Sequence, residues 1–224
     1  MRTYYARIDR IKEEIDCKQA MELLPDARIK KLARIKQEDS KWESLTAGLM
    51  LEYGLREYGL SGRSVTFLEN KDGKPYIFEY PDLHYNLSHS GAYVALAFSD
   101  VAVGIDLEKP RRNQMRLVER FFAEEESRLL LQNWSDEAFT RMWTRKESFI
   151  KACGIGMRMP LAGFSVATNQ VHISEKMAPD MVAKEDIFFV ESYQLAEGYW
   201  LSVCQQKNRI DELPKEVNLL DLWK

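Results

Sequence analysis

Apolar residues recur along much of the chain with the spacing of amphipathic helices. In residues 25–36, Ile29, Leu32 and Ile35 fall on one side of a helix that has a proline at its first turn. Residues 40–58 predict a longer helix, which a glycine ends. The same periodicity predicts further helices in the second part of the chain, at residues 114–122, 123–133 and 136–153.

Other segments are rich in β-branched and aromatic residues and predict strands. Residues 92–98 and 101–108 are the most apolar of these, and we expect them to pair as a hairpin that reverses at Ser99 and Asp100. Helices and strands are therefore mixed along the whole chain. The remaining predicted strands are residues 4–10, 65–68, 164–167, 171–174, 187–195 and 199–205.

The run Lys109-Pro-Arg-Arg-Asn113 interrupts this pattern, and we expect residues 109–113 to form a joint between two halves. The predicted halves are residues 1–108 and 114–224. A faint internal similarity supports related halves, because residues 85–96 and 193–204 each read as a strand end, a glycine turn and an apolar strand. Two unrelated hairpins would give the same pattern, so both interpretations stay open.

Composition and charge are those of an ordinary soluble globular protein, with 45% hydrophobic and 30% charged residues among 224. The 32 basic and 35 acidic residues nearly balance, which argues against a protein that coats nucleic acid. The three cysteines form no Cys-x-x-Cys motif and fit free thiols in a reducing compartment. The longest apolar run, residues 92–98, is far shorter than the ~18 residues of a membrane span. We expect a cytoplasmic monomer without nucleic-acid or membrane partners.

The clearest candidate for chemistry is the segment Gly104-Ile-Asp-Leu-Glu108. Residues two apart on a strand point to the same side, so Asp106 and Glu108 would face the same way at the end of an apolar strand. Two such carboxylates repel each other unless a cation lies between them. Magnesium suits this place because it prefers hard oxygen ligands and often binds substrate phosphates. The alternative is a strand end that faces solvent, and this short pattern by itself favours that alternative.

Residues 139–151 predict an amphipathic helix with charges in an unusual position. Lys146 falls within the apolar stripe, where burial of an ammonium group is unfavourable. Glu147 and Lys151 are four residues apart and therefore adjacent on the edge of the stripe. One interpretation is a surface ion pair beside a Lys146 side chain that extends to solvent. The other, which the place of Lys146 favours, is a rim of three charges that faces a polyanion.

Further polar and basic residues fit the recognition of phosphate groups. Ser88 and His89 precede Ser90-Gly91 in a segment rich in hydrogen-bond donors. A lone histidine is more often structural, but adjacent Ser and His do not form a hydrolase triad, and Gly-x-Ser-x-Gly is absent from the sequence. We therefore interpret Ser88 and His89 as donors to a ligand. Basic candidates, with a solvated surface as the alternative, are Arg28, Lys30, Lys31 and Lys74.

Several of these segments occur together in the order of a known family. They are Gly73-Lys-Pro75, Asn86-Leu-Ser-His-Ser-Gly91, Gly104-Ile-Asp-Leu-Glu108, Arg120-Phe-Phe122, and Trp143-Thr-Arg-Lys-Glu-Ser-Phe-Ile-Lys151 with Gly154-Ile-Gly156. Each motif alone is weak, but their order and spacing make the joint match specific. Through them the chain resembles the 4′-phosphopantetheinyl transferases, of the larger type that activates peptide synthetases such as surfactin synthetase.

The resemblance implies an α+β fold with two similar α/β halves related by a pseudo-two-fold axis. Each half would have a small, mostly antiparallel sheet packed on helices, and the active site would lie in the cleft between the halves. It also implies an activity, because these enzymes move the phosphopantetheine arm of coenzyme A to a serine of an apo acyl or peptidyl carrier protein. The other product is 3′,5′-ADP, and the reaction depends on magnesium.

By position, the resemblance assigns roles to residues of this chain. Asp106, Glu108 and Glu147 would hold magnesium. Glu147, Lys151 and His89 would be catalytic, with Glu147 or a metal-bound water taking the proton of the carrier serine. The residues that would bind coenzyme A are Arg28, Lys30, Lys31, Lys74, Ser88, His89, Lys146 and Lys151.

One position departs from the family pattern, and another matches it only loosely. Ala27 stands where relatives can carry a basic residue for the 3′-phosphate, so neighbouring basic residues would share that role. Glu126 matches an acidic position that can approach the metal, with a solvated helix start as the alternative.

The carrier proteins of this family are acidic helical domains. The candidate surface for one, with simple solubility as the alternative, is Arg111, Arg112, Arg116 and Arg120.

Two other classes of function compete with a transferase. One is a module that binds coenzyme A or a nucleotide and has lost turnover, and the three intact carboxylates argue against it. The other is a metal-dependent phosphohydrolase, which would show more metal ligands than this sequence does. The change Glu147→Gln separates an enzyme from a binding module, because an enzyme would lose far more turnover than ligand affinity.

Overall fold

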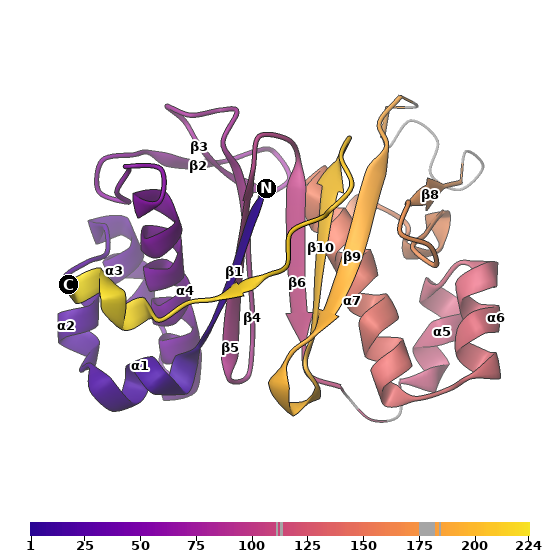
Figure 1. Ribbon diagram of the computed structural model, residues 1–224, viewed down its shortest axis with the longest axis horizontal. Helices are drawn as coiled ribbons and strands as arrows, with labels where there is room; N and C mark the ends of the chain where they lie inside the picture. The colour runs from indigo at the N-terminus through magenta and orange to yellow at the C-terminus, as the bar shows by residue number, and fades with distance from the viewer. Residues whose placement is uncertain (111, 113, 175–181, 184) are drawn as a thin grey trace.

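The computed structural model describes residues 1–110, 112, 114–174, 182–183 and 185–224 of the chain. Two sheets pack against each other at the centre, and helices cover the outer face of each (Figure 1). The expected α+β fold, with small and mostly antiparallel sheets packed on helices, is confirmed. Within the described ranges, we find no helix with both the length and the apolar character needed to cross a bilayer.

The first sheet has the strand order β11-β1-β5-β4, and all neighbours are antiparallel except β11 and β1. Its strands are β1 (Arg2–Arg7), β4 (His84–Ser90), β5 (Tyr93–Ser99) and β11 (Lys215–Glu216). The longest helix of this half packs on β5, and the shorter ones pack on that helix. These helices are α1 (Ile8–Glu14), α2 (Cys17–Met21), α3 (Asp26–Leu32) and α4 (Glu38–Arg56). A separate hairpin consists of β2 (Phe67–Glu69) and β3 (Pro75–Ile77).

The second sheet is antiparallel, with the order β6-β10-β9. Its strands are β6 (Val103–Glu108), β9 (Phe188–Gln194) and β10 (Trp200–Gln206). One long helix packs across β6 and β10, and two shorter helices lie beyond it (Figure 1). They are α7 (Asp136–Cys153), α5 (Met115–Phe121) and α6 (Glu124–Gln132). The connection from α7 to β9 contains η1 (Gly156–Arg158), η2 (Leu161–Gly163), β7 (Phe164–Ser165) and β8 (His172–Ile173), and η3 (Ala196–Gly198) joins β9 to β10.

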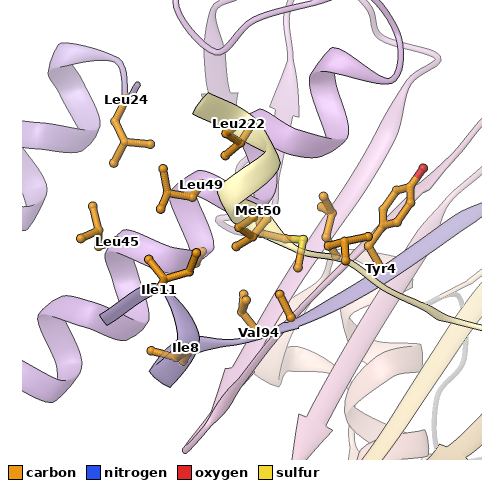
Figure 2. Close-up of a cluster of buried hydrophobic side chains, with 14 of the residues drawn as sticks. Tyr4, Ile8, Ile11, Leu24, Leu45, Leu49, Met50, Val94 and Leu222 are labelled. Atoms are coloured by element: carbon orange, nitrogen blue, oxygen red, sulfur yellow. The ribbon is translucent and has the colours of Figure 1, made fainter. Parts of the chain in front are cut away.

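The alternation of side chains along β5 contributes to two cores at once. Leu96 and Phe98 belong to the core between the first sheet and its helices, part of which is drawn in Figure 2. Ala95 and Ala97 belong to a second core, where they meet residues of β6 such as Ile105. Every residue of β5 is buried as a result. This two-sided burial explains why the strand reads as an unbroken apolar run.

The expected hairpin between residues 92–98 and 101–108 is wrong. β5 pairs with β1 and β4, whereas β6 pairs with β10. The chain crosses from one sheet to the other directly after β5, where the Ser99 hydroxyl lies 3.3 Å from Gln205 Oε1 of the second sheet. The small side chains of Ala95 and Ala97 let the two sheets pack face against face, so the two strands do not join edge to edge.

The other predicted elements agree with the structure apart from their ends. α7 has the predicted bounds, and α4, α5 and α6 differ from the prediction by a few residues. The strand predicted at residues 4–10 is too long, because α1 begins at Ile8. The similar segments 85–96 and 193–204 both form hairpins, with Gly91 (φ +54°) and Gly198 (φ +77°) near the turns.

The division into residues 1–108 and 114–224 stays a prediction, and residues 111 and 113 of the joint lie outside the described residues. Two features cross that division. β6 precedes the joint but pairs with β10, which follows it. The C-terminal segment returns to the first half, where β11 pairs with β1 and the 3₁₀-helix η4 (Leu219–Trp223) packs on α4.

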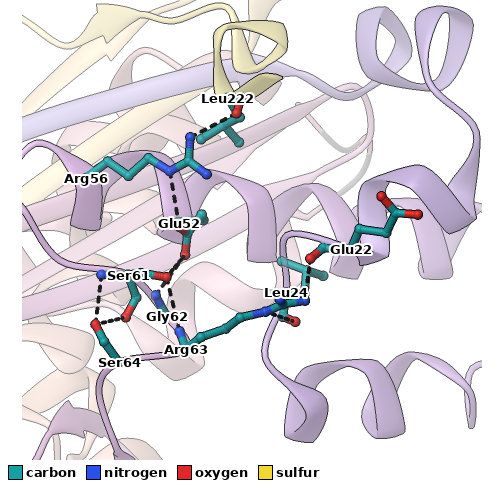
Figure 3. Close-up of polar contacts among 9 residues, drawn as sticks. All are labelled: Glu22, Leu24, Glu52, Arg56, Ser61, Gly62, Arg63, Ser64 and Leu222. Carbon is teal, nitrogen blue, oxygen red and sulfur yellow. Dashed lines mark hydrogen bonds and ion pairs between the residues drawn. The ribbon is translucent and has the colours of Figure 1, made fainter. Parts of the chain in front are cut away.

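A buried charge ties this C-terminal segment to α4 (Figure 3). Glu52 is 4% exposed and accepts a hydrogen bond from the Gly62 N–H at 2.8 Å. Its other oxygen lies 3.2 Å from Arg56 Nε, and Arg56 Nη1 donates to the Leu222 carbonyl at 2.8 Å. The carboxylate is therefore paired rather than left bare in the interior.

Candidate active site

Gly104 lets α7 lie directly on β6. A Cβ atom at this position would be 2.1 Å from the Ser148 carbonyl oxygen and 2.3 Å from the Ala152 nitrogen. Only a glycine permits so close an approach of the helix backbone to the strand. The residue two positions on, Asp106, faces the same side and therefore meets the last turns of α7.

Lys151 on α7 and Asp106 on β6 form the centre of a polar network that joins the two sheets. Lys151 Nζ lies 2.6 Å from Asp106 Oδ1 and donates to the Ile105 carbonyl at 3.1 Å and to Ser88 Oγ at 3.2 Å. Ser88, on β4 of the first sheet, also lies 3.1 Å from Asp106 Oδ1 and accepts from the Leu107 N–H at 3.2 Å. The second oxygen of Asp106, Oδ2, is buried and has no hydrogen-bond partner in the described part of the chain.

The three predicted metal ligands lie within electrostatic reach of one another. Burial raises the pKa of Glu147, and Asp106 and Glu108 raise it further, while Lys151 opposes them. Glu108 Oε2 lies 3.4 Å from Ser90 Oγ on β4. Among the described residues, however, no group of three or more histidine, cysteine, aspartate or glutamate side chains is arranged to hold a metal ion. The carboxylates share a neighbourhood but do not converge on one point.

Cations gather around His89, on the first-sheet side of this network. His89 Nδ1 lies 3.6 Å from Glu43 Oε2 of α4. Burial lowers the pKa of His89, Glu43 raises it, and Lys151, Arg28 and Lys31 lower it further. Three of the predicted phosphate-binding cations are therefore close enough to act on one imidazole ring.

A cavity of about 390 Å³ opens between α3, α4, β4 and the β2–β3 hairpin. Arg28 and Lys31 line it, and so does Ala27. Arg28 Nη2 donates to the Ser44 carbonyl at 2.9 Å, whereas its Nε is buried without a hydrogen-bond partner in the described structure. Burial also lowers the pKa of Arg28. Lys30 is exposed and does not line this cavity.

Comparison with known proteins decides the family. A sequence profile described as the 4′-phosphopantetheinyl transferase superfamily matches residues 102–204. The chain is 31% identical over 180 residues to the 4′-phosphopantetheinyl transferase gsp of Aneurinibacillus migulanus. The aligned residues cover 77% of this chain and 72% of that protein. The chain belongs to this superfamily.

A second relative extends the sequence match over most of the chain. The 4′-phosphopantetheinyl transferase Sfp of Bacillus subtilis (strain 168) is 29% identical over 208 residues, which cover 91% of this chain and 92% of that protein. The solved structure of Thermotoga maritima holo-[acyl-carrier-protein] synthase aligns with 49% of this chain and 64% of that one, at 22% identity and a TM-score of 0.38.

In this member of the 4′-phosphopantetheinyl transferase superfamily, the structure corrects the position expected for Lys146. The side chains of Lys146 and Glu126 are both 0% exposed, so Lys146 does not lie at an open rim. Lys146 Nζ is 2.7 Å from Glu126 Oε2, donates to the Phe164 carbonyl at 2.8 Å and lies 4.1 Å from the centre of the Phe164 ring. An ammonium group can be buried in this way because a carboxylate, a carbonyl and an aromatic face surround it.

Glu126 lies in the first turn of α6 but is buried. It is therefore neither solvated nor open toward the other carboxylates. Its Oε1 accepts from the Val166 N–H at 2.7 Å, and its Oε2 accepts from the Ala123 N–H at 2.8 Å. Together with Lys146, these donors occupy both oxygens. Glu126 therefore joins the start of α6 to α7 and to the segment after β7.

Lys74 does not line the cavity, and its side chain reaches the end of α7. Its Nζ donates to the Ala152 carbonyl at 2.7 Å and to the Val103 carbonyl at 3.0 Å. Burial lowers the pKa of Lys74 to about 8. The predicted contact of Lys74 with a nucleotide stays a prediction, and the ammonium already has two protein acceptors.

Sequence reasoning missed two side chains that organise this superfamily member's site, and strand periodicity would have found them. On β4, positions 86, 88 and 90 share one face. Asn86 Oδ1 accepts from the Ile105 N–H at 2.9 Å, and Ser90 reaches Glu108, so this face of β4 lies along β6. The same periodicity turns His89 to the opposite face, toward α4, so Ser88 and His89 do not point together.

Proposed function

We propose that the protein transfers the 4′-phosphopantetheine arm of coenzyme A to a serine of an apo carrier protein and releases 3′,5′-ADP. The observation that carries this proposal is the network of Ser88, Asp106 and Lys151 where the two sheets meet, with one buried Asp106 oxygen left unpaired in the described structure. Membership of the 4′-phosphopantetheinyl transferase superfamily supports the reaction type.

The chemistry of the side chains at this place suits a magnesium ion, although the three carboxylates do not converge on one point in the described structure. Asp106 Oδ2 is a buried carboxylate oxygen without a hydrogen-bond partner among the described residues, a condition that a bound cation would relieve. Asp106, Glu108 and Glu147 offer the hard oxygen donors that magnesium prefers. When bound, magnesium would neutralise charge on the pyrophosphate of coenzyme A and on the departing 3′,5′-ADP.

Coenzyme A is a polyanion, and the cations around His89 match it in charge. We propose that Lys151 and His89 donate to the phosphates that react, and that Arg28, Lys30 and Lys31 meet the third phosphate. The Arg28 Nε, buried without a partner in the described structure, is a donor still available for this purpose. The neighbouring cavity of about 390 Å³ would receive part of the nucleotide.

The reaction requires that the serine hydroxyl of the carrier lose its proton as its oxygen attacks the phosphorus that bears the pantetheine arm. Glu147 is the proposed acceptor of that proton. Burial and its acidic neighbours raise the pKa of Glu147, and a more basic carboxylate is a better general base. Lys151 would hold the phosphate oxygens where negative charge increases during the transfer.

The acidic carrier would meet a basic surface near the joint. Arg112, Arg116 and Arg120 are exposed, and Arg120 lies 5.1 Å from the centre of the Phe121 ring. Arg111, also predicted for this surface, lies outside the described residues. Such positive charges steer an acidic partner and set the association rate more than the final affinity.

The direct test uses the purified protein with magnesium, coenzyme A and a panel of apo carriers from fatty-acid, polyketide and peptide synthesis. We expect intact-mass spectrometry to show a carrier that has gained one phosphopantetheine arm, and kcat/KM across the panel to identify the carrier class. If no carrier in the panel gains mass, the proposal is overturned. If the protein then still binds coenzyme A tightly, the result supports the alternative of an inactive binding module.

The role of Glu147 is tested with a pair of variants on one helix. Glu147→Gln should lower kcat by ~10²-fold or more, the usual contribution of a general base, and should leave the Kd for coenzyme A nearly unchanged. Glu137→Gln changes an exposed carboxylate in the first turn of α7 and should alter neither value. A Glu147→Gln protein with normal turnover would contradict the assignment.

A further inference from the structure

The turn between β2 and β3 is a rigid support for a side chain that leaves it. Asn70 N–H donates to the Lys74 carbonyl at 2.9 Å, and Asn70 Oδ1 accepts from the N–H groups of Asp72 and Lys74, each at 2.9 Å. Gly73 takes a φ of +86°, which a side chain would disfavour. The turn satisfies its own backbone, so its side chains are free to contact other parts of the molecule.

Three side chains join this turn to the end of α7, to the start of β6 and to η1, which follows α7. Lys74 Nζ donates to the carbonyls of Ala152 and Val103, at 2.7 and 3.0 Å. Asn70 Nδ2 donates to the Gly154 carbonyl at 3.1 Å, and Asp72 Oδ2 lies 2.6 Å from Arg158 Nη2. The last carbonyls of a helix carry partial negative charge and lack partners within the helix, so an ammonium group there is favourable.

Gly154 shows that this contact is closely fitted. It ends α7 with a φ of +67°. A Cβ atom at this position would lie 2.6 Å from Lys74 Cδ and 3.3 Å from Lys74 Cβ. The glycine thus permits the left-handed helix end and also leaves room for the stem of Lys74.

We propose that Lys74 is a positioning residue, which fastens the end of α7 to β6 and so holds Glu147 and Lys151 opposite Asp106. The inference rests on the proposed function. The hairpin that carries Lys74 also lines the nucleotide cavity through Phe67, Glu69 and Pro75. The β2–β3 hairpin therefore contacts both the cavity and the end of α7, so a ligand in the cavity and the position of α7 depend on the same hairpin. Lys74 acts through the backbone of α7, and contact with the nucleotide is not its role.

The test separates a positioning residue from a nucleotide ligand. Lys74→Met should lower kcat at least tenfold, because small displacements of reacting groups cost large factors in rate. The Kd for coenzyme A, measured by calorimetry, should change less than twofold. Hydrogen exchange at the amides of residues 149–154 should become faster. Lys71→Met, at an exposed position of the same turn, should leave all three values unchanged.

A second variant keeps the proposal testable if Lys74→Met does not fold. Asn70→Asp retains the acceptor that shapes the turn but replaces the Nδ2 donor with an oxygen that repels the Gly154 carbonyl. It should reproduce the fall in kcat and the faster exchange, to a smaller extent, without a change in Kd. A rise in Kd that matches the fall in kcat/KM, with unchanged exchange, would overturn the proposal. Absence of transfer by the wild type would contradict the proposed function instead, while exchange and affinity would still test the contact.

Discussion

At the scale of single residues, Lys74 makes the stability of the protein depend on pH. Burial lowers its pKa from 10.5 to about 8 in the folded state. Between these values the unfolded chain binds a proton that the folded chain does not, so the free energy of unfolding rises with pH through this window. Wild type should therefore gain up to ~3 kcal/mol relative to Lys74→Met between pH 8 and 10.5, at about 1.36 kcal/mol per pH unit.

Urea unfolding at pH 7, 8.5 and 10 measures this difference, because other titrating groups contribute equally to both proteins. A parallel comparison of wild type with Lys71→Met should be independent of pH, since Lys71 is exposed. If the difference for Lys74→Met is the same at all three pH values, the ammonium group is not as desolvated as the structure indicates.

The sequence was informative about which residues take part in the site and less so about which of them pair. Asp106 and Lys151 follow from motifs, and they meet as strand and helix periodicity require. Lys146 was correctly placed on an apolar face, but its partner Glu126 is 20 residues away in sequence and belongs to another helix. Local patterns do not reveal such a partner. From the sequence alone, the place of Lys146 therefore indicates a rim of charges that faces a polyanion, and not a buried ion pair.

At the scale of elements, the contact of α7 with β6 depends on Gly104. Gly104→Ala places a methyl group 2.1 Å from a backbone oxygen of α7, and the helix must move to accommodate it. We expect a loss of ~1–3 kcal/mol in the free energy of unfolding, as for other overpacked sites, and a large fall in kcat of the protein that remains folded. Both are measurable by urea unfolding and by the mass-gain assay.

Val103→Ala is a suitable control, because it removes a buried side chain of the same strand on the face away from α7. It should destabilise the protein without lowering the kcat of the folded fraction. Equal falls in kcat for the two variants would show that kcat reports general stability and not the distance between β6 and α7.

The ion pair of Lys146 and Glu126 is a second link between elements, from α6 to α7. Removal of one partner leaves a bare buried charge, so Lys146→Met should cost ~3–5 kcal/mol in the free energy of unfolding. The double variant Lys146→Met with Glu126→Gln should be more stable than the sum of the single changes predicts. Thermal or urea unfolding of the four proteins gives the coupling energy, and strictly additive effects would contradict a buried pair.

The helices α3 to α7 could be predicted from the sequence because an apolar face identifies each of them, most clearly in α7, whereas α1 and α2 were not predicted. Strand pairing could not, because β5 is buried on both faces and its sequence does not distinguish an edge-to-edge neighbour from a sheet packed against it. The pairing of β6 with β10 depends on strands nearly a hundred residues apart, which local signals do not connect.

At the scale of the whole molecule, the candidate site is built from both sheets and from the helix on the second sheet, and it depends on their mutual position. Ser88 and His89 come from the first sheet, whereas Asp106, Glu147 and Lys151 come from the second sheet and its helix. The C-terminal segment adds a further link, because it leaves β10 of the second sheet and ends on the helices of the first half. We therefore expect the halves to unfold together rather than as separate domains.

This expectation can be tested at the C-terminal segment itself. Leu219 and Leu222 are 1% and 5% exposed in the first core, whereas Leu213 is 77% exposed. Leu219→Ala and Leu222→Ala should each lower the free energy of unfolding by ~2–5 kcal/mol, and Leu213→Ala should change it by less than ~0.5 kcal/mol. If the halves form one cooperative unit, hydrogen exchange at β6 and α7, far from the substitutions, should become faster by the same factor as exchange at α4. Faster exchange confined to α4 and β1 would show instead that the first half unfolds alone, and that the site loses its first-sheet residues before its carboxylates.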